Sequence, residues 1–190
     1  LTSEDIKNEC LFNMRVDGNP VKVSRLFLGN EYKLQVKALA NHFKVPDDYH
    51  RKVKFNQDIF FKIKKDFMPM FKWSSISSEN MPEETKIAYD KFEHAYHQLM
   101  LELVLLQEKS IRSALGDTSI AKLYIDGGFS NNEVYIQLLS QCLGPIKLST
   151  TDSSLGSALG AAIVISNSKL NSKFLKKNYA LKKHRPFTLI

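Results

Sequence analysis

The sequence predicts an α/β fold, because short β-rich runs alternate with longer stretches in which apolar residues recur at helical spacing. The clearest unit is residues 123–139, where a buried strand reaches Asp126, two glycines follow, and an amphipathic helix starts near Asn131. A long helical pattern at residues 83–115 precedes this unit, and Gly116 is expected to stop it. Together, these features predict helices packed against a sheet.

The N-terminal part is expected to begin with a short helix that runs to about Cys10, because acidic residues in its first turn suit the helix dipole. Paired strands are predicted at residues 12–16 and 21–23, around an Asp-Gly sequence that favours a tight reversal. A helix with one apolar face is then predicted over residues 30–43, and a proline follows it.

Residues 46–82 are a candidate insertion within the domain. Strands or strand-like segments are predicted at residues 53–55 and 58–63, and a serine-rich connection leads to the long helix from Glu83. The aromatic side chains of this segment predict core or lobe-interface packing, and stacking on a sugar is the alternative. They are Phe60, Phe61, Phe67, Phe71 and Trp73.

Composition and charge describe one globular domain with a basic tail. The chain has 190 residues, of which 43% are hydrophobic and 25% charged, enough for a sizeable core. The basic residues at positions 168–190 account for the net charge of +7, so the remaining body is balanced and no nucleic-acid partner is expected. They are Lys169, Lys173, Lys176, Lys177, Lys182, Lys183 and Arg185. The tail also holds Phe174, Tyr179 and Phe187, which could dock it on the body.

Other residue patterns argue against a membrane protein and against a structural metal site. The longest apolar run, residues 158–165, is far shorter than the roughly 20 residues of a membrane span. Cys10 and Cys142 have neither metal nor redox spacing, which fits a reducing cytoplasm. His94 and His97 lie three positions apart, but no carboxylate or cysteine is spaced to complete a zinc site, so ordinary polar surface is predicted.

The Gly127-Gly128 turn carries the strongest functional signal. Two glycines allow a closeness of approach that side chains would block, and the following helix presents free N–H groups at its positive end. Such a turn suits a phosphate or ribose oxygen, although a ligand-free turn can have the same sequence. Asp126 could contact Mg²⁺ through water or brace the turn, and both interpretations stay open. A second helix, at residues 155–165, is built from small residues that let backbone or a flat ligand lie close: Gly156, Ala158, Gly160, Ala161 and Ala162.

The order of these motifs resembles the C-terminal lobe of the FGGY family of carbohydrate kinases. Over residues 85–165 the pattern is a long helix, Asp-Gly-Gly, Asn, Gln-Leu-Leu, Leu-Gly, a strand, a Ser/Thr loop and Ala-Leu-Gly-Ala-Ala. Residues 20–45 match more loosely. The resemblance implies a ribonuclease-H-like lobe of the actin/hexokinase superfamily, with a mixed sheet flanked by helices. Within the family, the pattern is similar to rhamnulokinases and xylulokinases.

The resemblance also implies the activity. An FGGY kinase transfers the γ-phosphate of ATP, with Mg²⁺, to a hydroxyl of a sugar or polyol, and its N-terminal lobe supplies the catalytic base and most of the sugar pocket. No counterpart of that lobe is found in these residues. We therefore expect residues 1–167 to be the nucleotide-binding lobe of a larger polypeptide, inactive alone, with residues 168–190 as a basic tail.

The resemblance implies nucleotide-binding residues at the two glycine turns and assigns no catalytic residue to this chain. The residues are Gly127, Gly128, Phe129, Ser130, Asn131 and Asn132, with Gly29 and Asn30 as further candidates at the earlier turn. A homodimer is left open. The alternative function is a non-catalytic actin-like scaffold or regulatory module. A dinucleotide-binding domain is disfavoured, because the Gly-x-Gly-x-x-Gly spacing is missing.

Overall fold

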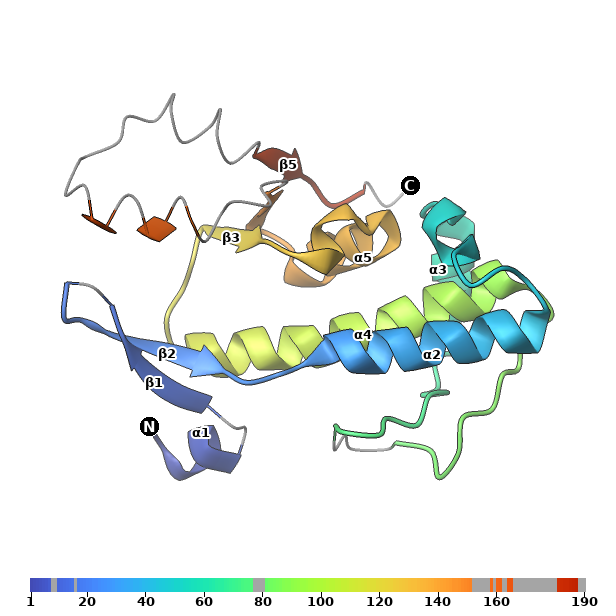
Figure 1. Ribbon diagram of the computed structural model, residues 1–190, viewed down its shortest axis with the longest axis horizontal. Helices are drawn as coiled ribbons and strands as arrows, with labels where there is room; N and C mark the ends of the chain where they lie inside the picture. The colour runs from blue at the N-terminus through green and yellow to red at the C-terminus, as the bar shows by residue number, and fades with distance from the viewer. Residues whose placement is uncertain are drawn as a thin grey trace.

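The computed structural model describes residues 1–7, 10–15, 17–76, 81–151, 158, 160–161, 164–165 and 181–187, and the description below concerns these residues. The described residues form both helices and strands, as the sequence predicts (Figure 1). The elements in chain order are α1 (Ser3–Lys7), β1 (Cys10–Met14), β2 (Pro20–Ser24), α2 (Leu28–Phe43), the 3-10 helix η1 (Tyr49–Lys52), α3 (Gln57–Lys65), α4 (Phe92–Leu115), β3 (Lys122–Ile125), the 3-10 helix η2 (Gly128–Asn131), α5 (Glu133–Leu143), β4 (Lys147–Thr150) and β5 (Lys182–His184).

The described strands form two sheets. β1 and β2 pair antiparallel as a hairpin, with Leu11 opposite Val23. The other sheet has the order β3-β4-β5, in which β3 and β4 run parallel, with Leu123 opposite Leu148, and β5 joins antiparallel. The predicted hairpin and mixed sheet are therefore confirmed. The parallel pair needs a crossover, and α5 provides it directly after the double-glycine turn.

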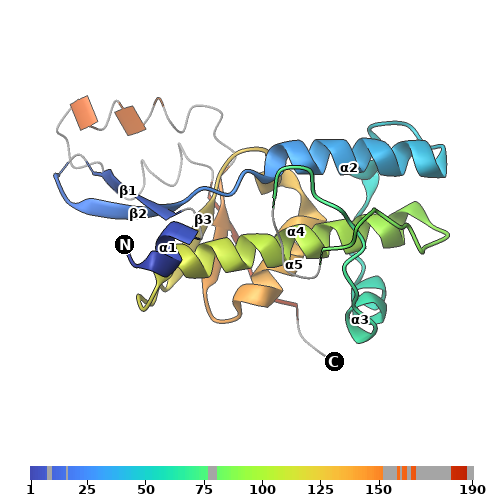
Figure 2. The ribbon, with the colours of Figure 1, turned by 90° about the horizontal axis from the view of Figure 1, so that it is seen from below.

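Helix α4 is the centre of the core, and it runs along α2 in both ribbon views (Figures 1 and 2). Its Leu99 and Leu103 are fully buried, together with Leu39 of α2 and Leu138 of α5. Burying each leucine contributes about 1.5–3 kcal/mol, so this packing holds α2 and α5 in place against α4. Gly116, with φ +55°, ends α4 as predicted.

The predicted strands at 53–55 and 58–63 are wrong, because helix α3 occupies residues 57–65 and no strand forms at 53–55. The Asn56 side chain caps α3, since its Oδ1 accepts hydrogen bonds from the backbone N–H groups of Asp58 and Ile59. The helix buries Phe60 and Ile63, which lie three positions apart on one face. A capping asparagine before a short apolar run is therefore the signal that the strand prediction missed.

The long helix also begins later than predicted, at Phe92 and not at residue 83. The preceding segment pairs with the chain around residue 70, because the backbone N–H of Lys86 donates to the carbonyl oxygen of Met70 at 3.2 Å. The N–H of Lys72 donates to the hydroxyl of Thr85 at 2.9 Å. The first bond satisfies a backbone N–H that a helix would otherwise use, and both bonds join this segment to the chain around residue 70, so tertiary contacts outweigh the local helix propensity here.

Two buried carboxylates hold the segment around residues 70–75. Glu102 of α4 accepts hydrogen bonds from the backbone N–H groups of Met70, at 2.7 Å, and Phe71, at 3.2 Å. Glu31 of α2 accepts bonds from the N–H and the hydroxyl of Ser75, both at 2.6 Å. Burial raises the pKa of Glu102 to about 7, although its hydrogen bonds oppose that shift. Phe71, Trp73 and Phe60 are buried, which confirms the prediction of core packing for these rings.

The C-terminal segment docks on the body at residues 181–187. β5 adds to the edge of β4, and the hydroxyl of Thr150 lies 2.9 Å from the Nε2 atom of His184. The Phe187 ring packs against Phe55 and Phe60, at centroid distances of 5.0 and 5.4 Å. Phe174 and Tyr179, also expected to dock, lie outside the described residues.

The small-residue helix predicted at 155–165 is described at five positions only. Residues 158, 160–161 and 164–165 are helical, and Gly156 and Ala162 lie outside the described residues. A search of the described helices finds none that is both long and apolar enough to cross a membrane.

Candidate functional site

The turn after β3 has the geometry that its two glycines predict. Gly127 has φ +85° and ψ −158°, a conformation that residues with a side chain rarely adopt. Its carbonyl oxygen accepts hydrogen bonds from the backbone N–H of Ser130, at 3.0 Å, and from the Ser130 hydroxyl, at 2.7 Å. Ser130 is buried, so its hydroxyl holds the turn closed and does not face a ligand.

The two asparagines after this turn have different surroundings. The Asn132 side chain is used inside the protein, because its Oδ1 caps α5 by accepting the N–H of Tyr135 and its amide donates to the Tyr96 hydroxyl at 2.8 Å. Asn131 is exposed. Of the two, Asn131 is therefore the better placed to reach a ligand through its side chain.

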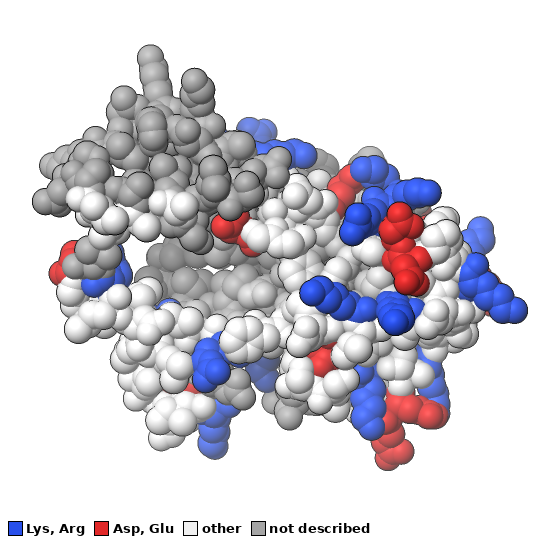
Figure 3. Space-filling view, viewed as in Figure 1, with Lys and Arg blue, Asp and Glu red and all other residues white. Residues whose placement is uncertain are grey.

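A cavity of about 620 Å³ lies between the start of α2 and the turn after β3. Small-molecule pockets in proteins typically measure about 300–1,000 Å³. The surface in Figure 3 is hollowed between β3 above and the chain from β2 into α2 below. One wall comes from segment 26–33 and the other from Gly128 and Phe129. The lining residues are Leu26, Phe27, Leu28, Gly29, Asn30, Tyr32, Lys33, Gly128 and Phe129.

The cavity thus brings together the two glycine positions that the sequence singled out. Gly29 does not form the predicted turn before a helix, because it is already the second residue of α2. Gly29 and Asn30 line it with Gly128 and Phe129, although the two pairs are far apart in the chain. The other predicted site residues, Gly127, Ser130, Asn131 and Asn132, belong to the same turn but do not line the cavity. Sequence reasoning missed the other five lining residues, which are Leu26, Phe27, Leu28, Tyr32 and Lys33. Their only signal was their position within one helical turn of Gly29.

Aromatic rings support the wall that Phe129 forms. The Phe129 ring stacks on Tyr135, with centroids 4.5 Å apart and planes at 28°, and lies 5.2 Å from the ring of Tyr32. The hydroxyl of Tyr32 is 3.2 Å from that of Tyr96, and burial raises the pKa of both phenols. The two phenols therefore stay neutral near pH 7 and act as structural supports. Phe129 both packs on the core and lines the cavity.

The cavity walls expose bare backbone at two glycines. A Cβ built at Gly29 or Gly128 would meet no atom within 4 Å, and neither residue has a left-handed backbone. Gly29 lies in the first turn of α2, where N–H groups lack helical partners, and no side chain caps this helix. Lys33 adds a positive charge to the lining. The site thus combines accessible backbone donors, a helix N-terminus and a cation, features that suit an anion.

Asp126 is connected to the neighbouring strand. Its Oδ1 accepts a hydrogen bond from the hydroxyl of Thr151, and the N–H of Thr151 donates to the carbonyl oxygen of Ile125 at 2.9 Å. This bond ties the end of β3 to the residue after β4 and not to the glycine turn, so the two interpretations of Asp126 stay predictions. Asp126 is also exposed, so its carboxylate could reach a hydrated Mg²⁺ ion beside the turn. Among the described residues, no group of three His, Cys, Asp or Glu side chains is arranged to hold a metal.

His97 is not the ordinary surface residue that was predicted, since it is 1% exposed. Its Nε2 accepts the backbone N–H of Asn56 at 3.0 Å, and its Nδ1 lies 2.7 Å from the carbonyl oxygen of Glu93. This pairing requires the neutral form protonated on Nδ1, and burial lowers the pKa of His97 accordingly. His97 therefore joins α4 to the residue that caps α3.

The sequence matches the family described as "Carbohydrate kinase FGGY, C-terminal domain" over residues 2–173. The chain belongs to this family. A solved structure with a similar fold is "The crystal structure of a carbohydrate kinase from Novosphingobium aromaticivorans", with a TM-score of 0.58 and 18% sequence identity. The match covers 94% of this FGGY chain and 37% of that enzyme. A comparison with proteins of curated function finds no match.

The match confirms the predicted fold, a mixed α/β lobe of the actin/hexokinase type. The likeness to rhamnulokinases and xylulokinases within the FGGY family stays a prediction.

Proposed function

We propose that this FGGY domain is the nucleotide-binding half of an ATP-dependent carbohydrate kinase, which transfers the γ-phosphoryl group of ATP to a sugar or polyol hydroxyl. The observation that supports this most strongly is the single cavity that both glycine positions line. Both glycine positions are predicted from the sequence to contact a nucleotide, and the cavity places them within reach of one ligand.

The proposed roles follow from the lining of the cavity. The backbone at Gly29 and Gly128 lets the nucleotide approach closely, and Phe129 gives an apolar wall on a rigid aromatic support. Lys33 and the start of α2 attract the phosphates. Asp126 would hold the magnesium that accompanies ATP through its water shell, and the bound ion would offset phosphate charge during transfer.

Sugar binding and deprotonation of the acceptor hydroxyl are assigned to a second lobe, since this chain spans 37% of the matched carbohydrate kinase. This domain contributes by orienting the nucleotide and by closing over it. Closure excludes water that would otherwise accept the phosphoryl group. We place the enzyme in a reducing cytoplasm, which agrees with two cysteines that are not joined in a disulfide.

Isothermal titration of the chain with ATP and Mg²⁺ tests the proposal. Gly128→Val should abolish binding, because the new side chain enters space that is open in the fold, and the variant should remain folded by circular dichroism. Ala38→Val adds similar bulk at an exposed position of α2 and should bind ATP normally. Equal affinity of Gly128→Val and the unmodified chain would contradict the site. Absence of ATP binding by the folded, unmodified chain would favour a non-catalytic scaffold.

A further inference from the structure

The residue that precedes α2 is an unusual choice for its position. Phe27 occupies the N-cap of α2, where side chains that accept N–H bonds are preferred, and it makes no side-chain cap. Its ring is 71% exposed, so it contributes little to the core. Neither helix capping nor burial therefore accounts for a phenylalanine here.

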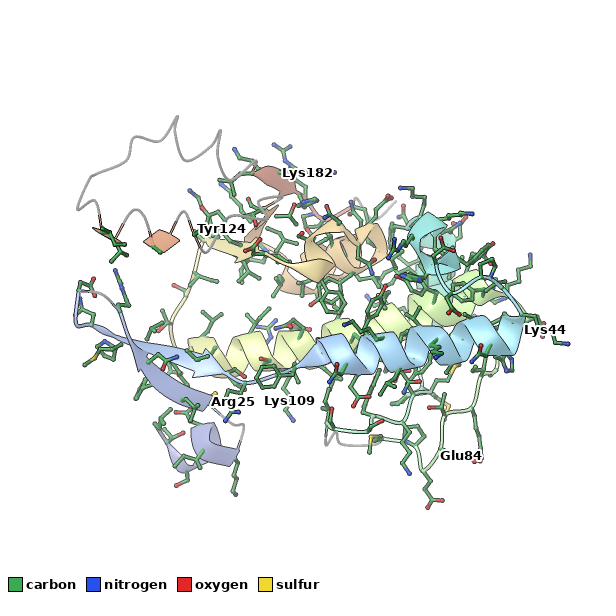
Figure 4. All side chains as sticks on the ribbon, viewed as in Figure 1. Arg25, Lys44, Glu84, Lys109, Tyr124 and Lys182 are labelled. Carbon is green, nitrogen blue, oxygen red and sulfur yellow. The ribbon has the colours of Figure 1, made fainter. Side chains whose placement is uncertain are left out.

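The surroundings of Phe27 point to a ligand. Its side chain lines the cavity at the start of α2, and the guanidinium carbon of Arg25 lies over the ring, 5.8 Å from its centroid. Figure 4 labels Arg25 in the connection from β2 to α2. Phe129 lines the cavity from the other segment, held by its stack on Tyr135. The cavity thus has an aromatic ring in each of the two segments that form it.

Polar side chains are few among the described residues that line this cavity. They are those of Asn30, Tyr32 and Lys33, and the Tyr32 hydroxyl is already paired with that of Tyr96. Lys33 is a cation suited to phosphate. Asn30 is therefore the one described lining side chain left to read the hydrogen-bonding edge of a base, and the rings of Phe27 and Phe129 offer it two aromatic faces.

We propose that Phe27 is the residue on which the nucleobase stacks, and that this cavity accepts ATP and GTP with little discrimination. The inference rests on the proposed function, because it assumes that the cavity holds the nucleotide. Stacking is tolerant of base identity, since every base has a π face. Removing one such aromatic contact typically weakens binding by about 5- to 150-fold.

The test compares ATP, GTP and inorganic tripolyphosphate, each with Mg²⁺, by isothermal titration. Phe27→Ala should weaken both nucleotides by about 5- to 150-fold and leave tripolyphosphate unchanged, because that probe has no base. Phe27→Trp should keep the affinity for ATP. Phe12→Ala, which removes another exposed phenyl ring away from this cavity, is the matched control and should bind as the unmodified chain does.

Three results would overturn the inference while leaving the proposed function in place. They are unchanged ATP affinity in Phe27→Ala, an equal loss of tripolyphosphate affinity in that variant, or a preference of the unmodified chain for ATP over GTP of about 100-fold or more. Failure of the unmodified, folded chain to bind ATP would instead overturn the proposed function together with this inference.

Discussion

Replacement of Gly29 by alanine should change stability and nucleotide binding in opposite directions. Gly29 is the second residue of α2, its backbone lies outside the left-handed region, and an added Cβ would meet no atom within 4 Å. Gly29→Ala should therefore raise the free energy of unfolding by about 0.4–1 kcal/mol, since alanine loses less conformational entropy on folding. In a chain of this length the melting temperature should rise by about 1–4 °C.

The same methyl group enters the wall of the cavity. If a nucleotide packs against bare backbone there, the methyl group should cost about 1–3 kcal/mol of binding, or about 5- to 150-fold in affinity. Urea denaturation without ligand measures the first effect, and isothermal titration with ATP and Mg²⁺ measures the second. An Ala variant at Gly29 that binds ATP as tightly as the unmodified chain would refute the argument.

Ala38→Gly is the matched control for this experiment, because Ala38 lies on the same helix and is exposed. It should lower the free energy of unfolding by about 0.5–1 kcal/mol without changing the affinity for ATP. A loss of affinity in this control would mean that binding follows helix stability and not the shape of the cavity.

Two further predictions concern the fold. Burial raises the pKa of Glu102 from 4.5 to about 7, so its contribution to stability is complete below about pH 4.5 and is lost as the pH rises through 7. Across that range, the unfolding free energy of the unmodified chain should fall by about 3 kcal/mol relative to that of Glu102→Gln. Urea denaturation at several pH values measures this difference. A difference that does not change with pH would contradict the raised pKa. Phe187→Ala should lower stability by about 1–2 kcal/mol and reduce hydrogen-exchange protection of Lys182–His184, whereas unchanged protection would show that the ring does not hold β5.

Local residue pattern predicted the elements that depend on local chemistry. The hairpin at β1 and β2, the end of α4 at Gly116 and the double-glycine turn followed by α5 all agree with the structure. In each, a turn residue with special backbone freedom defines the boundary, so the signal lies within a few positions. Prediction failed where partners come from far along the chain. Residues 83–91 look helical, but the backbone N–H of Lys86 bonds to Met70 and the Thr85 hydroxyl bonds to the backbone of Lys72.

Within the site, the same distinction separates the residues that were predicted from those that were missed. The glycines at 29 and 127–128 could be recognised from the sequence pattern, although only Gly127 has a backbone conformation that favours glycine. Asn132 was predicted to contact a ligand, but its side-chain amide donates a hydrogen bond to the Tyr96 hydroxyl. Phe27 and Lys33 gave no signal beyond their position close to Gly29, since their role depends on which segment lies opposite.

The residue types alone establish the α/β class, the glycine turns, the basic tail and the likeness to FGGY kinases, because each depends on short-range patterns. Only the folded chain decides that Gly29 meets the turn at Gly128 across one cavity. That meeting depends on the packing of α2 and α5 against α4, which buries leucines from all three helices. Such long-range burial is specified by the sum of many weak contacts and by no single motif.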